Sequence, residues 1–169
     1  MKQKPALAGA AAAAAVALAF AGRAGGEPPA GGQFVPGESL GGVELGMTRG
    51  EVLDTWGARH GVCRDCREEI WYFNERPFRP EGTGVVFEDG RVAHAFTVWQ
   101  PQGWFTPEGL ELGDAVGEVG AAYGELTERA CSAYSALVLE HDDAAAVFYV
   151  YEDELWGFGL VTPGRSPCL

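Results

Sequence analysis

The hydrophobic pattern of this chain occurs twice. Residues 42–57 align without gaps on residues 109–124, and eight of the sixteen positions are identical. In each copy, apolar residues recur at the spacing of one helix face, and the glycine that follows is suited to end a helix. The repeat therefore predicts two helices of roughly ten residues each. Their apolar faces comprise Val52, Leu53 and Trp56 in the first copy and Val116, Val119 and Tyr123 in the second.

Polar residues mark the start of both predicted helices. Thr48 and Glu51 have the spacing of a capping box, in which each side chain accepts a hydrogen bond from the backbone of the other residue. In the second copy Asp114 is predicted to be the N-cap, because a short acidic side chain satisfies free N–H groups at a helix start.

Three short segments with the composition of strands follow each predicted helix. Asp89-Gly90 predicts a tight hairpin turn between two strands of the first copy. Since one layer of this kind buries only one face of a sheet, two copies are expected to share a core. The predicted fold class is α+β, with two tandem repeats of a helix plus an antiparallel sheet and the helices packed on one face of the sheet. The predicted strands are 70–73, 84–88, 93–99, 135–139, 145–151 and 155–161.

Composition divides the chain into five regions. Lys2 and Lys4 precede an alanine-rich apolar run, and Ala19-Phe20-Ala21 has the small-x-small pattern that signal peptidase cleaves. The apolar run is shorter than the ~20 residues of a membrane-spanning helix, which favours export without stable membrane insertion after cleavage. We therefore expect a secreted or otherwise extracytoplasmic protein. The predicted regions are a signal peptide (1–21), a flexible Gly/Pro/Ala leader (22–40), repeat 1 (41–100), a linker (101–107) and repeat 2 (108–169).

Net charge restricts the class of partner. Both lysines lie in the predicted signal peptide, so the remaining chain has ten arginines and 24 acidic residues, a formal charge of −14. Such a surface repels nucleic acid and anionic membranes and favours cationic partners or solubility. Nucleic-acid binding is excluded on this ground.

The four cysteines favour disulfide bonds. An even number in an exported chain is typical of two disulfides, and four cysteines allow three pairings. The preferred pairing is one disulfide in each half, Cys63 with Cys66 and Cys131 with Cys168. Because Cys63 and Cys66 form a C-x-x-C motif, a redox-active dithiol remains an alternative.

No catalytic, metal or cofactor site is predicted. No serine lies in a G-x-S-x-G motif. His141-Asp142-Asp143 resembles a metal-binding fragment but is better explained as a polar turn between two strands. The acidic pairs are typical of a solvated surface on so acidic a chain.

Aromatic residues are the best candidates for a binding surface. The chain has 19 of them, many in the predicted strands, and Tyr and Trp dominate binding hot spots. Side chains alternate between the two faces of a strand, so part of this set is expected on the face opposite the helices. The predicted partner-binding residues are Trp71, Phe73, Trp99, Trp104, Tyr149 and Tyr151.

A family resemblance adds to this interpretation. The segment Leu45-Gly-Met-Thr-Arg-Gly-Glu-Val52 followed by antiparallel strands is similar to the SmpA/OmlA (BamE-like) assembly lipoproteins. Two tandem copies, exported, with one cysteine pair each, resemble the β-lactamase inhibitory protein (BLIP) family. That resemblance implies an aromatic-rich sheet that grips a protein partner. The predicted function is an exported, non-enzymatic, inhibitor-like protein-binding module of unknown target. The alternatives are a cell-envelope structural or assembly factor and a C-x-x-C thiol oxidoreductase.

Overall fold

A computed structural model describes residues 29–73 and 82–169. The predicted signal peptide, residues 1–21, lies outside the described residues. None of the helices in the described ranges is long and apolar enough to cross a membrane.

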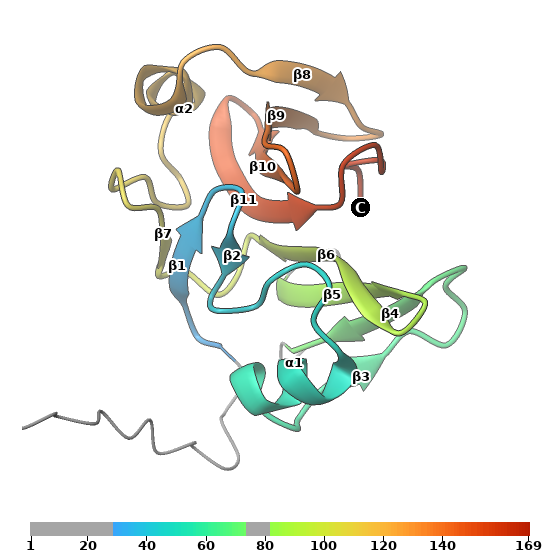
Figure 1. Ribbon diagram of the computed structural model, residues 1–169. Coiled ribbons are helices and arrows are strands. Elements are labelled where there is room, and N and C mark those ends of the chain that lie inside the picture. The colour runs from blue at the N-terminus through green and yellow to red at the C-terminus, as the bar shows by residue number, and fades with distance from the viewer. Residues whose placement is uncertain (1–28, 74–81) are drawn as a thin grey trace, which may run out of the picture.

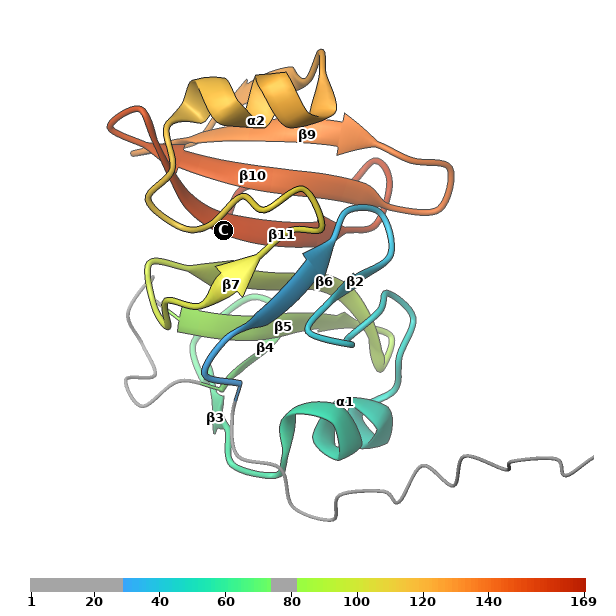
Figure 2. The same cartoon turned by 90° about the vertical axis from the view of Figure 1, so that its left-hand side faces the viewer.

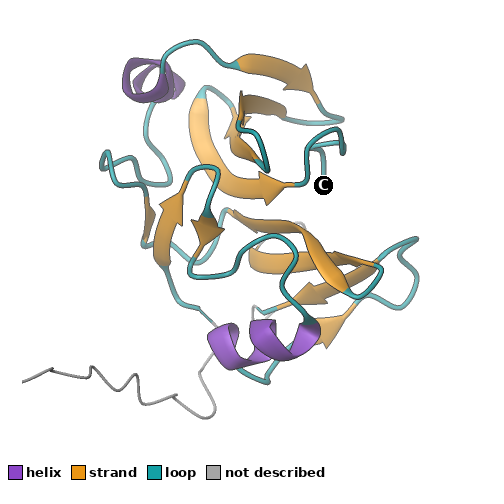
Figure 3. Cartoon of the chain, in the orientation of Figure 1, coloured by secondary structure: helices purple, strands orange, loops and turns teal. Residues whose placement is uncertain are grey.

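One eight-stranded antiparallel sheet runs through both halves of the chain (Figures 1 and 3). Strands β6 and β11 lie at its centre and join the halves, with His94 of β6 opposite Val161 of β11. The six strands predicted from sequence are all present, and their ends differ from prediction by up to two residues. In order across the sheet the strands are β3 (Gly61–Val62), β4 (Glu69–Tyr72), β5 (Gly82–Glu88), β6 (Arg91–Val98), β11 (Glu154–Val161), β10 (Ala145–Tyr151), β9 (Ser135–Glu140) and β8 (Thr127–Ala130).

A second, three-stranded sheet lies across the middle of the large one, and Figure 2 shows β1 and β7 in front of it. Its strands are β2 (Ser39–Leu40), β1 (Gly32–Val35) and β7 (Trp104–Phe105). They come from segments expected to be a flexible leader and a linker. Phe34, Leu40 and Trp104 are fully buried, so these segments contribute to the core.

The two helices are short and lie towards opposite ends of the sheet (Figure 2). Helix α1 (Arg49–Trp56) has the predicted capping box between Thr48 and Glu51. Helix α2 (Val116–Tyr123) begins after Ala115, which makes no side-chain capping bond. The predicted N-cap, Asp114, instead accepts a hydrogen bond from the backbone N–H of Glu111, 2.7 Å away, so its carboxylate stabilises the preceding turn.

The predicted fold class is wrong. The protein is mostly β, with one continuous eight-stranded sheet rather than two helix-plus-sheet repeats. Each helix has eight residues, and α1 fully buries two side chains and α2 one. Helices this small cannot cover a sheet of eight strands. The three-stranded sheet therefore covers its middle, where Phe34 packs against Phe148 and Phe158 at ring distances of 5.7 and 5.1 Å.

Each face of the large sheet carries its own hydrophobic cluster. The face that bears the helices and the small sheet is called here the helix face, and its cluster includes Trp56, Phe73 and Phe158. The opposite face is built around Phe96, Val147 and Tyr149. The last residues of the chain cross it, since the hydroxyl of Tyr149 donates to the carbonyl oxygen of Pro167 at 3.1 Å.

Both disulfides have the preferred pairing, which is thereby confirmed. Cys63 is bonded to Cys66 within the first half. Cys131 is bonded to Cys168 and fixes the last residues of the chain beside β8 and β9. Two disulfides fit a protein that folds in an oxidising compartment.

Candidate functional site

The six predicted binding aromatics divide into a buried and an exposed group. Trp99 and Tyr151 are 50% and 42% exposed. The other four are at most 7% exposed, so the expectation that water reaches them is wrong. These four are Trp71, Phe73, Trp104 and Tyr149.

Trp71 and Phe73 lie on the helix face, which is the wrong side of the sheet for the predicted role. Phe73 packs edge-on against Trp56 of α1, with ring centres 5.2 Å apart. Because side chains alternate along a strand, Ile70 and Tyr72 lie on the opposite face instead, and both are half-buried. The sequence indicated the alternation but not which set faces the helices.

Tyr149 lies on the predicted face but is covered. Its hydroxyl donates to Pro167 and lies 2.8 Å from Nε2 of His94. Since the hydroxyl proton goes to Pro167, Nε2 of His94 carries a hydrogen and donates to the tyrosine oxygen. Burial, with a smaller contribution from the charge of Arg165, lowers the pKa of His94 to about 3. Burial also raises the pKa of Tyr149, so both groups are neutral near pH 7.

Trp104 is buried beneath the small sheet. A Cβ on Gly41 would lie 2.7 Å from its ring, so glycine is needed there for the close packing. Residues 101–107 were predicted to be a linker and Trp104 a partner-binding residue. In the structure Gly32 and Gly41, which are distant in sequence, let the backbone approach the indole ring of Trp104.

The two exposed aromatics share one hollow with a third. Trp99, Tyr151 and Trp156 meet around a space of about 280 Å³, and the rings of Tyr151 and Trp156 lie 6.2 Å apart. We call this space the aromatic hollow. Gln102, Leu112, Gly113, Glu152, Glu154 and Leu155 complete its lining.

Trp156 was not among the predicted binding residues, and a β-bulge determines the face on which it lies. Tyr149 is opposite Gly157 and Val150 is opposite Leu155, so Trp156 is the extra residue between these pairs. The bulge places Trp156 against the cluster of the opposite face, whereas Phe158 belongs to the helix face. Regular alternation along the strand would instead place Trp156 and Phe158 on the same face.

The backbone holds Trp99 at the mouth of the hollow. Its φ is 63°, a left-handed conformation that bulky residues rarely adopt. Its N–H donates to the carbonyl oxygen of Trp156 at 2.8 Å, and its carbonyl oxygen accepts from Nε2 of Gln102 at 2.9 Å. The backbone of Trp99 is thus hydrogen-bonded through both its N–H and its carbonyl group, while its indole is half-exposed.

Carboxylates line the hollow, and among the residues that the structure describes no lysine or arginine lines it with them. Glu152 and Glu154 flank the β10–β11 turn, where Glu152 and Asp153 have φ values of 50° and 67°. This turn is fixed to the start of α2, because the N–H of Val116 donates to the carbonyl oxygen of Asp153 at 2.9 Å. Neither glutamate forms an ion pair within the described part of the chain. The hollow thus combines aromatic walls with negative charge.

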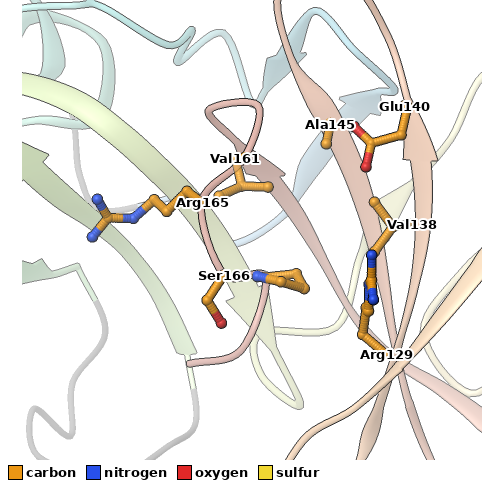
Figure 4. A pocket seen from close by; sticks show the side chains of 9 residues that line it. Arg129, Val138, Glu140, Ala145, Val161, Arg165 and Ser166 are labelled. Atoms are coloured by element: carbon orange, nitrogen blue, oxygen red, sulfur yellow. The ribbon is translucent and has the colours of Figure 1, made fainter.

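A second hollow, of about 380 Å³, lies between the C-terminal residues and β8 to β10. Arg129, Glu140 and Arg165 contribute to its lining. In Figure 4 the guanidinium of Arg165 is directed away from Arg129 and Glu140. It forms ion pairs with Glu68 and Glu88, so the C-terminal residues are tied to the first half of the sheet. Arg165 therefore has a structural role here.

The C-x-x-C cysteines and the metal-ligating residue types were the other candidates for chemistry. Cys63 and Cys66 are joined as a disulfide. In residues 29–73 and 82–169, no group of three or more His, Cys, Asp or Glu side chains is arranged to hold a metal ion.

Comparisons with known proteins give one distant likeness. No protein family and no curated protein matches the chain. Among solved structures, an extracellular protein containing an SCP domain from Bacillus anthracis str. Ames superposes with a TM-score of 0.49 and 14% identity. The superposition covers 70% of this chain and 44% of that protein, so the chain spans less than half of its length.

Proposed function

We propose that this protein is an exported, non-enzymatic binding module that contacts a protein partner through the aromatic hollow. The observation that carries the proposal is the half-exposed indole of Trp99, held in a left-handed backbone conformation by hydrogen bonds on both sides. Exposed tryptophan surface and rare backbone conformations both oppose folding. They are common where a protein binds something.

The surroundings of Trp99 support a protein contact. Tyr151 is 42% exposed beside it, and Trp156 is half-buried against Tyr134, with ring centres 5.4 Å apart. Aromatic anchors near the centre of a patch, surrounded by polar groups that remain solvated, are typical of protein interfaces. The hollow has a volume of about 280 Å³, at the lower end of the roughly 300–1,000 Å³ of small-molecule pockets. It fits one side chain of a larger partner.

Export is part of the same proposal. The signal-peptide pattern of residues 1–21 and the two disulfides are both typical of an extracytoplasmic protein. A partner is therefore sought among envelope and secreted proteins.

The test compares exposed aromatics inside and outside the hollow. Trp99→Ala and Tyr151→Ala baits are exposed to envelope and culture-supernatant extracts beside the wild type. Phe105→Ala is the matched control, because Phe105 is 42% exposed but does not line the hollow. A protein that the wild type captures should bind at least about fivefold more weakly to both hollow variants. It should bind Phe105→Ala normally, and all three variants should melt within a few degrees of the wild type.

The proposal fails if the hollow variants capture every wild-type partner with unchanged affinity. It also fails if Phe105→Ala loses the partner as strongly as they do. In that case general exposed apolar surface, and not the hollow, would determine capture.

A further inference from the structure

The aromatic hollow also indicates the chemistry of its occupant. Resting on the proposed function, we propose that the hollow receives an arginine side chain from the surface of the protein partner. The walls are indole and phenol rings, the rim is negatively charged, and the chain as a whole has a formal charge of −12.

The aromatic walls favour a cation. The faces of indole and phenol rings carry negative potential and attract a cation positioned over them, most strongly for Trp. Trp99, Tyr151 and Trp156 contribute three such rings, two of which are more than 40% exposed. The ring planes of Tyr151 and Trp156 are inclined by 46°, so they form two walls of a concave site rather than a closed stack.

The carboxylates favour a cation that also donates hydrogen bonds. Glu152 and Glu154 both line the hollow, and no lysine or arginine of residues 29–73 and 82–169 lines it with them. A bound cation would therefore meet two carboxylates that form no ion pair within residues 29–73 and 82–169. Long-range attraction by the acidic surface would speed encounter with a basic partner and weaken as salt is added.

Arginine matches this combination better than lysine does. A guanidinium is planar, stacks on aromatic rings and donates in a fork that matches a carboxylate. The lysine ammonium is a strongly hydrated point charge, so it loses more on leaving water. A volume of about 280 Å³ exceeds the ~30 Å³ of one water and admits a long side chain.

The experiment uses short peptides and the indole N–H resonances of the intact protein. Acetyl-Gly-Arg-Gly-amide is titrated while the five tryptophan indoles are followed by NMR. The resonances of Trp99 and Trp156 should shift and saturate in the millimolar range, while those of buried Trp56 and Trp104 stay fixed. The peptide with citrulline, a neutral isostere of arginine, should bind at least about tenfold more weakly, and the lysine peptide should fall between them.

Removing the carboxylates of the hollow tests the role of charge, and removing a carboxylate elsewhere is the control. Glu152→Gln/Glu154→Gln should weaken the arginine peptide about tenfold and remove most of its salt dependence. Glu140→Gln removes one negative charge at an exposed site outside this hollow and should change affinity less than twofold. Equal shifts with the arginine and citrulline peptides, or none at Trp99, would overturn the arginine inference.

The bait experiment separates this inference from the proposed function. A captured partner lost by Trp99→Ala but retained by Glu152→Gln/Glu154→Gln would uphold protein binding and reject the arginine contact. A partner insensitive to Trp99→Ala would reject the proposed function, even if the arginine peptide binds the hollow.

Discussion

The two copies of the sequence repeat begin alike and are stabilised differently. Thr48 and Ala115 occupy equivalent positions, as do Trp56 and Tyr123 at the other end of the aligned segments. Thr48 completes a capping box, and Trp56 is 2% exposed with its Nε1 donating to the carbonyl oxygen of Gly41 at 3.0 Å. Ala115 makes no cap, and Tyr123 is half-buried. The same local pattern thus gives a strongly anchored helix α1 and a weakly anchored helix α2.

Ion pairs also distinguish α1 from α2. Arg49 of α1 forms an ion pair with Glu69 of β4 and lies 5.2 Å from the ring centre of Phe87. The hydrogen bond from Arg49 lowers the pKa of Glu69. No ion pair of α2 occurs in the described ranges. The second half has a long-range disulfide instead, whereas that of the first half closes only a few residues.

If the proposed function is correct, the weaker anchoring of α2 is related to partner binding. The aromatic hollow is formed mostly by the second half, with Trp99 contributed by the end of the first half. It lies beside α2, because Leu112 and Gly113 line it and the turn after β10 bonds to Val116. Regions that bind ligands tend to come from the less stable part of a fold. The weaker helix and the hollow are therefore expected to be linked in stability.

The largest expected effect is a difference in the free energy of unfolding between alanine variants at the equivalent positions Trp56 and Tyr123. Trp56→Ala leaves a large buried space and removes the bond to Gly41, so it should lower the free energy of unfolding by about 3–5 kcal/mol. Tyr123→Ala removes a half-buried ring that lies 5.0 Å from Phe148 and should cost about 1–2 kcal/mol. Urea unfolding measures both, and Trp56→Phe is the conservative control. Equal losses would mean that the helices are anchored equally.

The two disulfides should contribute differently to stability, because they close loops of different length. In the chain-entropy description a longer closed loop restricts the unfolded chain more. Cys131 and Cys168 are 37 residues apart, so Cys131→Ser/Cys168→Ser should cost about 4 kcal/mol. Cys63→Ser/Cys66→Ser, with a separation of 3, should cost about 2 kcal/mol. Urea unfolding under non-reducing conditions gives both values. A larger loss from the short pair would contradict the view that the second half depends on its covalent link.

The sequence predicted those parts of the fold that local residue patterns determine. The helices and six strands were found because their periodicity is local. The strands β1, β2 and β7 were missed, since the glycines in and next to them serve contacts with distant residues, such as Gly41 against Trp104. The exposure of Trp99 and Tyr151 was predicted correctly. Trp71 was assigned to the wrong face, and Trp156 changes face at a bulge, because register depends on pairing partners that a single strand does not specify.

A smaller effect on stability is expected when pH is lowered, because His94 is buried near the junction of the two halves. His94 of β6 bonds to Tyr149 of β10, and its pKa of about 3 lies below the ordinary 6.5. Above pH 6.5 the imidazole is neutral in both folded and unfolded chains, so stability is at its full value. As pH falls from 6.5 towards 3, only the unfolded chain gains the proton, and stability falls by about 1.4 kcal/mol per pH unit.

Urea unfolding at pH 7 and pH 5 tests this expectation, with a predicted loss of about 2 kcal/mol from His94. His94→Gln keeps a donor for Tyr149 but does not titrate, so it should remove most of that loss. Hydrogen bonds also lower the pKa values of Glu51 and Glu69, and their contributions are lost only at lower pH. An unchanged slope in His94→Gln would show that other groups control stability in this window.

The smallest expected effect on stability comes from the N-terminal caps of the two helices. Adding a cap to α2 would make the two helix starts more alike. Ala115 has φ −66° and ψ 139°, close to the −76° and 164° of Thr48, and Glu118 already occupies the position equivalent to Glu51. The N–H of Glu118 already donates to the carbonyl oxygen of Ala115 at 2.9 Å, so Ala115→Thr would add a side-chain acceptor to a donor that has a partner. Completing the second capping box should therefore raise the free energy of unfolding by only about 0.5 kcal/mol. Thr48→Ala should lower it by about 1 kcal/mol. Ala115→Val is the control, because it is also β-branched but has no oxygen to accept the N–H of Glu118. If Val stabilises as much as Thr, the gain does not come from capping, and the difference between the two helix starts has another cause.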